Sequence, residues 1–252
     1  MTPPPPLPSG ERPPPDAPPA GAAWDGDALP QGEAKVQAVR QMFDAIAPRY
    51  DLVNRLMTFR LDVRWRRRAV RSLGLPPGSR VADLASGTGD LCLELARQGL
   101  RPLSADLSFG MLRADRSGAP RVQTDVLRLP LPQASLDGAT CGFALRNLVD
   151  LGPFFDELAR VLRPGGRIAL LDVATPPNPV LRWGHRVYFG RIVPMIGGLL
   201  SDPAAYRYLP KSVAYLPPPD VMLQRLGDAG FRAVDRVLLS GGITQLITAI
   251  RA

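Results

Sequence analysis

Apolar positions in the N-terminal part of the chain recur every three or four residues. This helical period predicts three consecutive helices, over residues 33–47, 50–58 and 62–73. Asp62 is expected to cap the start of the third helix and Gly74 to end it. The folded part of the chain is therefore predicted to begin with helices.

From residue 80 onward, short apolar strands alternate with amphipathic helices. The strands are predicted over residues 80–85, 101–105, 121–124, 137–143, 167–173, 232–239 and 243–250. The helices are predicted over residues 88–98, after Ser108, over 153–162 and over 220–229. This alternation is typical of an α/β fold in which helices cover both faces of a mostly parallel sheet, here one of seven strands. Residues 31–252 are interpreted as one Rossmann-like domain.

Two segments depart from this alternation. Residues 1–30 are rich in Pro, Ala and Gly and bury too little apolar area to offset the entropy of ordering, so a disordered tail is expected there. Residues 176–219 are aromatic and interrupted by prolines, and they are expected to build a lid or wall at a substrate site. A purely structural cap is the alternative for this insertion.

The chain carries a net charge of +8, and nearly all of its basic residues are arginines. The one dense basic cluster surrounds Trp65 and consists of Arg64, Arg66, Arg67, Arg68 and Arg71. We interpret it as a solvated helix face. Binding to acidic lipid headgroups or to nucleic acid is the alternative.

The sequence predicts a cytoplasmic protein. No apolar run approaches the roughly 18–20 residues that a membrane-spanning helix needs, and no secretory signal follows Met1. Cys92 and Cys141 lie in apolar segments and are expected to be buried free thiols, which fits a reducing compartment. No metal site is predicted, because His185 is the single histidine and no cluster has ligand spacing.

The sharpest motif, VADLASGTGD at residues 81–90, lies where the first strand turns into a helix. Gly87 and Gly89 allow a tight turn and the close approach of a ligand. The helix starting near Thr88 directs free N–H groups at that ligand. Asp83 precedes the turn and is placed to meet an ammonium group.

Two further acids end the next two strands. Asp106 is expected to accept hydrogen bonds from two ribose hydroxyls, and Asp125 from an adenine amino group. Because the carboxyl ends of parallel strands share one edge of the sheet, these acids and the glycine turn together predict a site for S-adenosylmethionine (SAM). A dinucleotide site is the alternative, but its G-x-G-x-x-G motif needs a glycine where this chain has Cys92.

Four more segments carry a distinctive pattern. They are YDLVNRLMT at residues 50–58, GFALRNL at 142–148, SDPAAYRYL at 201–209 and AGF at 229–231, with Gly241 and Gly242 near the C-terminus. Through them the chain resembles, over residues 33–250, the ubiquinone/menaquinone biosynthesis C-methyltransferases (the UbiE/MenG group). The segment RVLRPGG at 160–166 is shared with many class I SAM-dependent methyltransferases and adds little specificity.

The resemblance implies the class I SAM-dependent methyltransferase fold. It implies SAM contacts at Thr88, Asp106, Asp125, Val126 and Gly142. It also implies methylation of a ring carbon of a polyprenylated quinol, with demethylmenaquinol as the expected substrate and a benzoquinol or another small terpenoid or quinol as the alternative. Relatives commonly carry another small residue where this chain has Ser86, and SAM binding is expected to survive that difference.

A quinol ring carbon becomes nucleophilic when its hydroxyl loses a proton, so the site needs a proton acceptor and a group that holds the oxyanion. Arg146 follows the fourth strand and is predicted to hold the oxyanion or to orient a water, with support from Asn147 and Tyr50. Asp125 or Asp51 is expected to relay the proton.

Each of these catalytic assignments has a structural alternative. Arg146 has salt-bridge candidates in Asp150 and Asp156. Asn147 is compatible with a turn role and Tyr50 with core packing.

A polyprenyl tail needs an apolar groove, and residues 176–200, with Trp183 and Tyr188, are the predicted wall. Arg182, Arg186 and Arg191 beside them are expected to face lipid headgroups at the inner face of the cell membrane. No nucleic-acid partner is expected, and a homodimer is left open. A different small-molecule methyltransferase and a SAM-binding scaffold without catalysis are the other function classes; SAM binding without turnover would indicate the scaffold.

Overall fold

The structure is a computed structural model that describes residues 31–193, 195 and 212–252. The predicted disordered tail and the middle of the predicted lid lie outside the described residues, as does the segment at 201–209.

Seven strands form one sheet in the order β3-β2-β1-β4-β5-β7-β6. Their bounds are β1 Arg80–Leu84, β2 Arg101–Asp106, β3 Arg121–Gln123, β4 Leu136–Gly142, β5 Leu162–Val173, β6 Phe231–Leu239 and β7 Thr244–Arg251. Strands β1 to β5 pair in parallel, whereas β7 runs antiparallel to β5 and β6. The order of the strands reverses between β1 and β4, and open α/β sheets bind ligands at such a point. The predicted seven-stranded, mostly parallel sheet is confirmed.

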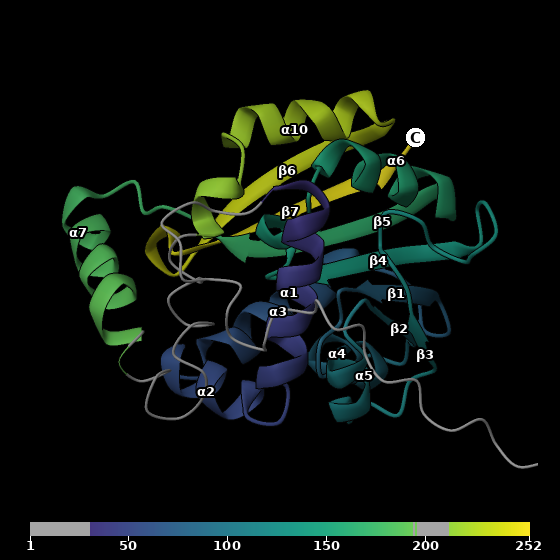
Figure 1. The fold of residues 1–252 in the computed structure, drawn as a ribbon. Coiled ribbons are helices and arrows are strands. Elements are labelled where there is room, and N and C mark those ends of the chain that lie inside the picture. The colour runs from purple at the N-terminus through teal and green to yellow at the C-terminus, as the bar shows by residue number, and fades with distance from the viewer. Residues whose placement is uncertain (1–30, 194, 196–211) are drawn as a thin grey trace, which may run out of the picture.

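Helices cover both faces of the sheet, and two more cross its carboxyl edge (Figure 1). One face carries α3 Leu61–Leu73, α4 Asp90–Arg97 and α5 Phe109–Ala114, and the other carries α6 Leu151–Val161 and α10 Pro219–Asp228. The edge carries α1 Gly32–Ile46 and α2 Tyr50–Met57, while α7 Pro179–Val187 stands apart from the sheet.

The interior strand β5 shows why both faces are covered. Ile168 and Leu170 belong to the core beneath α6 and α10, whereas Ala169 and Leu171 belong to the core beneath α3. Because successive side chains of a strand point to opposite faces, a continuous apolar run requires helices on both sides.

Two predicted helix starts are wrong. The helix predicted over residues 88–98 begins at Asp90, because Gly89 adopts a left-handed φ of 82° that a helix cannot include. Asp62 does not cap α3, which begins at Leu61. Its carboxylate is buried instead and accepts a hydrogen bond from Oγ1 of Thr58 at 2.7 Å.

Candidate active site

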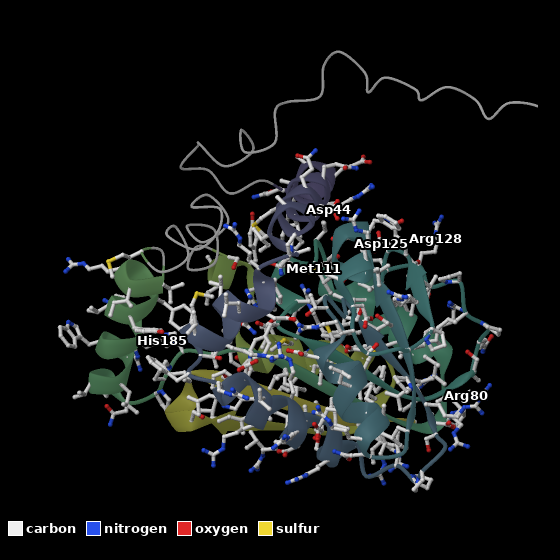
Figure 2. All side chains as sticks on the ribbon, turned by 90° about the horizontal axis from the view of Figure 1, so that it is seen from below. Asp44, Arg80, Met111, Asp125, Arg128 and His185 are labelled. Atoms are coloured by element: carbon white, nitrogen blue, oxygen red, sulfur yellow. The ribbon has the colours of Figure 1, made fainter. Side chains whose placement is uncertain are left out.

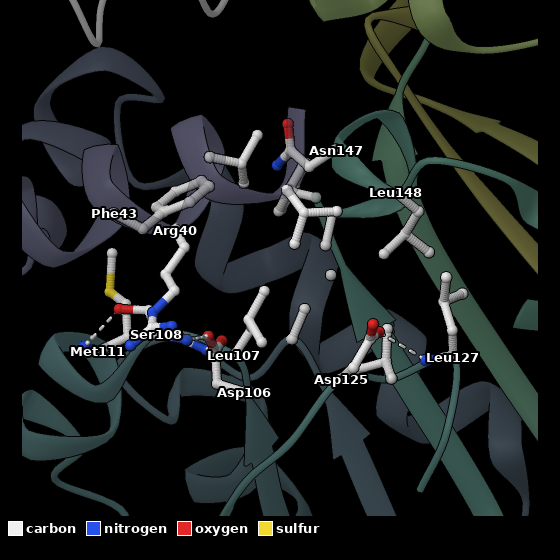
Figure 3. Close-up of a pocket in the computed structure, with 18 of the residues that line it drawn as sticks. Arg40, Phe43, Asp106, Leu107, Ser108, Met111, Asp125, Leu127, Asn147 and Leu148 are labelled. Atoms are coloured by element: carbon white, nitrogen blue, oxygen red, sulfur yellow. Dashed lines mark hydrogen bonds between the residues drawn. The ribbon is translucent and has the colours of Figure 1, made fainter. Parts of the chain in front are cut away.

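A pocket lies between α1 and the carboxyl ends of β1, β2 and β4, and we call it the α1 pocket. It contains about 830 Å³ of space free of protein atoms, and its walls are mainly apolar. The predicted site residues that line it are Tyr50, Gly87, Asp106, Asp125, Val126, Gly142 and Asn147. Figure 3 shows Asp106 and Asp125 apart from each other along the lower part of the pocket, with Asn147 near its top.

Asp106 ends β2 and is almost fully buried. Its two carboxylate oxygens accept hydrogen bonds from the backbone N–H groups of Gly87 and Ser108, each at 2.8 Å. Burial raises the pKa of Asp106 to about 6, although these backbone bonds work in the opposite direction. A carboxylate offers about four acceptor positions, so Asp106 can still accept bonds from a pair of hydroxyl groups in the pocket.

Asp125 lines the α1 pocket apart from Asp106 and is exposed. Its Oδ1 accepts a hydrogen bond from the N–H of Leu127 at 2.9 Å, and this bond fixes the turn after β3. Val126, between them, is buried and contributes an apolar wall.

A smaller pocket, which we call the inner pocket, continues from the α1 pocket at the turn after β1. Ala85, Gly87, Gly142 and Tyr50 line both pockets. Gly87 has a left-handed φ of 58°, so a residue without Cβ suits the turn. The predicted Gly89 lines neither pocket; a Cβ there would overlap the carboxylate of Asp115.

The turn after β1 is also held by side chains. Oγ of Ser86 lies 2.7 Å from Oγ of Ser104, so the unusual serine is used to tie the turn to β2. Oγ1 of Thr88 donates a hydrogen bond to Asp51 at 2.5 Å, and Arg116 forms an ion pair with the same carboxylate. Thr88 and Asp51 thus attach α2 to the inner pocket.

Asp83 lines the inner pocket from β1 and is fully buried. It accepts a hydrogen bond from Oγ1 of Thr140 at 2.8 Å and contacts Sγ of Cys92 at 3.8 Å. Burial raises its pKa to about 7. Cys92 and Cys141 are both buried free thiols, as predicted.

Arg66 is buried and lines the inner pocket. The prediction that it lies on a solvated helix face is therefore wrong. Its guanidinium pairs with Asp62 at 2.5 Å and lies 3.6 Å from Asp90. The helical period gives a signal for this burial, because Arg66 is one turn from Asp62 and from Val70, both buried. Arg64, Arg67, Arg68 and Arg71 are exposed.

A third and larger pocket, which we call the α7 pocket, lies between α2 and α7 and has about 1760 Å³ of space free of protein atoms, part of which is open to solvent. Its aromatic lining residues are Phe43, Tyr50, Phe59, Trp65, Phe143, Trp183, Tyr188 and Phe189. His185 lines the α7 pocket from α7. Figure 2 shows it well apart from Asp44, Met111 and Asp125, which lie around the α1 pocket. The described part of the predicted wall at 176–200 therefore does border a cavity.

The pockets meet at Tyr50 and Phe143. Tyr50 lines all three pockets, and Phe143 lines both the α1 and the α7 pocket. Phe143 has a left-handed φ of 62°, which is strained for a residue with a side chain. The bond from its N–H to the carbonyl of Leu171, at 2.6 Å, holds this conformation. Burial raises the pKa of Tyr50, so its hydroxyl keeps its proton at neutral pH.

Arg146 lines the α7 pocket, next to this junction, on the 3-10 helix η2 Leu145–Asn147. Its Nη1 donates hydrogen bonds to Asp172 at 2.5 Å and to the carbonyl of Phe143 at 2.7 Å, and its Nε donates to Ser212 at 3.2 Å. The salt-bridge partner is thus Asp172 at the end of β5, not Asp150 or Asp156. Asp150 instead caps α6 through the N–H of Gly152.

Comparison with known proteins identifies the family to which the chain belongs. Residues 31–251 match the model of the ubiE/COQ5 methyltransferase family. The chain belongs to the ubiE/COQ5 methyltransferase family. It is 41% identical to the ubiquinone/menaquinone biosynthesis C-methyltransferase UbiE of Syntrophotalea carbinolica, over 86% of this chain and 95% of the relative. It is 40% identical to the demethylmenaquinone methyltransferase of Roseiflexus castenholzii, over 88% of this chain and 97% of the relative.

Solved structures agree at the level of the fold. A SAM-dependent methyltransferase from Thermotoga maritima superposes with a TM-score of 0.56 at 17% identity, covering 84% of this chain and 99% of the other. One from Aquifex aeolicus gives a TM-score of 0.54 at 18% identity, covering 74% of this chain and 89% of the other. The predicted enzyme class and co-substrate are confirmed: this ubiE/COQ5 family member is a methyltransferase that uses SAM.

The predicted catalytic residues of this ubiE/COQ5 family member do not all face the same pocket. Arg146 lines the α7 pocket, Asn147 lines the α1 pocket and Tyr50 lines both. The predicted proton relays, Asp51 and Asp125, do not line the α7 pocket. His185 does, and its buried Nε2 has no hydrogen-bond partner among the residues that the structure describes.

The sequence also yielded no prediction for Lys35, which lies in the first turn of α1 and contacts the turn that carries Arg146. It is buried, and its Nζ donates to the carbonyls of Arg146 and Leu148. Burial lowers its pKa to about 8. Its position in the sequence could have indicated this burial, because Lys35 lies on the same apolar helix face as Ala38 and Met42.

Proposed function

We propose that this chain transfers a methyl group from SAM to a ring carbon of a polyprenylated quinol, with demethylmenaquinol as the substrate. The observation that carries the proposal is the junction at Tyr50 and Phe143, where the pocket at the sheet edge meets a large aromatic pocket. The names of the two relatives, a ubiquinone/menaquinone biosynthesis C-methyltransferase and a demethylmenaquinone methyltransferase, support the same substrate class.

The residues of the α1 and inner pockets fit SAM. Asp106 would hold the ribose hydroxyls, and Asp125 and Val126 would bound the adenine. The amino-acid end would lie in the inner pocket, where Arg66 can bind its carboxylate and Asp83 can attract its ammonium group. Gly142 supports this fit, because a Cβ there would lie 2.8 Å from Cδ1 of Leu91 and crowd the passage between the two pockets.

When bound, SAM supplies an activated methyl group on its sulfonium. The chain must then orient a quinol ring in the α7 pocket and stabilise its oxyanion. Arg146 lies at the junction with its Nε and Nη1 fixed by Ser212, Phe143 and Asp172, so its charge is preorganised for that oxyanion. Among the described residues that line this pocket, His185 would accept the proton directly, or a water held by Arg146 would relay it.

Methyl transfer from labelled SAM to chemically reduced demethylmenaquinone tests the proposal. A reduced, demethylated benzoquinone precursor is assayed in parallel. We expect transfer to the naphthoquinol. Transfer to the benzoquinol alone, or to neither substrate while SAM still binds, would contradict the assignment.

We further propose that the mouth of the α7 pocket contacts a membrane surface. Phe59, between α2 and α3, is 76% exposed and Trp183 of α7 is 68% exposed. The ring of Phe59 lies 6.0 Å from that of Tyr188, so the two segments form one apolar rim. Arg186 and Arg191 are exposed beside it, whereas Arg182 bonds the carbonyls of its own segment. Among the described residues, no helix is long and apolar enough to cross a membrane.

Replacing Phe59 and Trp183 by serine is expected to lower binding to anionic vesicles by about tenfold or more, because each exposed aromatic side chain that enters the lipid contributes about 1.5–3 kcal/mol. Flotation with phosphatidylglycerol-containing vesicles at low salt measures this. Phe109→Ser is the matched control, because Phe109 is an exposed phenylalanine on α5, away from the rim. Unchanged flotation of the double variant would refute the assignment of this surface.

A further inference from the structure

Lys35 is buried in the first turn of α1, and among the residues that the structure describes its ammonium group is held by carbonyl groups and an aromatic ring rather than by a carboxylate. The residue is 2% exposed. Its Nζ donates hydrogen bonds to the carbonyl of Arg146 at 3.1 Å and to that of Leu148 at 2.7 Å. The same nitrogen lies 3.5 Å from the centre of the ring of Tyr215. Carbonyl dipoles and an aromatic face are the compensation this buried cation receives within the described residues.

The two carbonyls belong to the residues on either side of Asn147. That turn divides the two substrate pockets, because Arg146 lines the α7 pocket and Asn147 lines the α1 pocket. The backbone bonds that the turn itself supplies are those of Asn147 to Ala144, at 2.8 Å, and of Leu148 to Leu145, at 3.2 Å. Lys35 therefore adds a second set of bonds to a short turn.

The helix that carries Lys35 is also a wall of the α1 pocket. Val36, the next residue, lines that pocket together with Val39 and Phe43, which lie about one and two turns further along α1. The bonds of Lys35 thus join the wall over one pocket to the backbone that presents Arg146 to the other, across 111 residues of sequence.

We infer that Lys35 is a positioning residue that sets the place of the Arg146–Asn147 turn between the two pockets. This inference rests on the proposed function, which gives Arg146 of that turn its role in methyl transfer. Its effect on turnover is exerted through Arg146, which touches the α7 pocket, while Lys35 does not line it. A residue that merely anchored α1 would leave the turn unchanged when it was lost.

Lys35→Met tests the inference, because methionine keeps most of the side-chain length and removes the charge and the donors. We expect faster hydrogen exchange of the amides of residues 145–148 in the variant. We also expect kcat to fall about tenfold or more, with little further loss when Arg146→Gln is already present, because residues that act as a unit are not additive. Gln41→Met, at an exposed position of the same helix, is the control.

The two readouts separate the possible failures. Wild-type exchange of the turn in Lys35→Met, or full additivity of the two substitutions, overturns the positioning role. Faster exchange of the turn in a protein that methylates no quinol keeps the positioning role and refutes the proposed function. If Lys35→Met does not fold, Lys35→Gln, which removes the charge but retains an uncharged amide N–H donor group, is measured in the same way.

Discussion

Replacing Arg146 by glutamine is expected to lower kcat by about 1,000-fold, which is the size of effect seen when one preorganised donor to an oxyanion is removed. The dissociation constant for SAM is expected to change by less than about threefold, because Arg146 lines the α7 pocket and not the α1 pocket. Single-turnover transfer from labelled SAM gives the rate, and titration calorimetry gives the affinity.

The control for this prediction must separate the loss of catalysis from the loss of stability caused by leaving Asp172 without its partner. That carboxylate is fully buried, and leaving it unpaired costs about 3–5 kcal/mol of stability. Arg146→Gln alone is therefore expected to lower Tm as well as kcat. The double variant Arg146→Gln, Asp172→Asn removes the buried charge, so we expect it to regain most of the Tm but not the rate. Recovery of the rate in the double variant would mean that Arg146 only neutralises Asp172.

The sheet and its functional edge could be predicted because their signals are local. Each strand is a short apolar run, and Asp106 and Asp125 follow directly from their places at two strand ends. The glycine turn at residues 86–89 is likewise a local motif. Strand ends share one edge in a parallel sheet, so Gly87, Asp106 and Asp125 line one pocket, as their local positions predict, although Gly89 of the same turn does not.

The side chains that bind the turn at residues 145–147 could not be predicted, because they depend on which strands are neighbours and on how α1 packs. Asp172 reaches Arg146 since β4 and β5 are neighbours with Gly142 beside Leu171. Closeness in the sequence instead favoured Asp150 and Asp156 as ion-pair partners of Arg146, but Asp150 caps α6 and Asp156 is exposed. Lys35 comes from an element more than a hundred residues away, and only the position of α1 across the sheet edge brings it to the turn.

The division of the site into three pockets also needed the structure. The sequence placed Arg146, Asn147 and Tyr50 in one catalytic group, whereas the turn directs neighbouring residues into different pockets. A turn of three residues in 3-10 geometry rotates successive side chains by about 120°, which explains the separation. This arrangement lets one short segment line both pockets.

Replacing Asp106 by asparagine is expected to raise the dissociation constant for SAM by about 100-fold at pH 7.5. Hydrogen bonds to a charged group contribute about 1.5–3 kcal/mol each, and about 1.4 kcal/mol corresponds to a factor of ten. Asparagine keeps the shape of the side chain but offers one acceptor atom and no charge. Titration calorimetry with SAM measures the change, and Asp228→Asn, at an exposed position of α10, is the charge-matched control.

The pH dependence of the same measurement tests the role of the carboxylate itself. The pKa of Asp106 is about 6 because of burial, so the charged acceptor form prevails above pH 6 and is lost as the pH falls below it. Wild-type affinity for SAM should therefore weaken progressively from pH 6 to pH 5. Asp83, with a pKa of about 7, contributes a separate dependence at higher pH that the variant retains. In Asp106→Asn only the decline that Asp83 causes should remain, so the loss of affinity from pH 6 to pH 5 should be shallower than in the wild type. An unchanged slope would assign the wild-type decline to another group and remove Asp106 as the ribose acceptor.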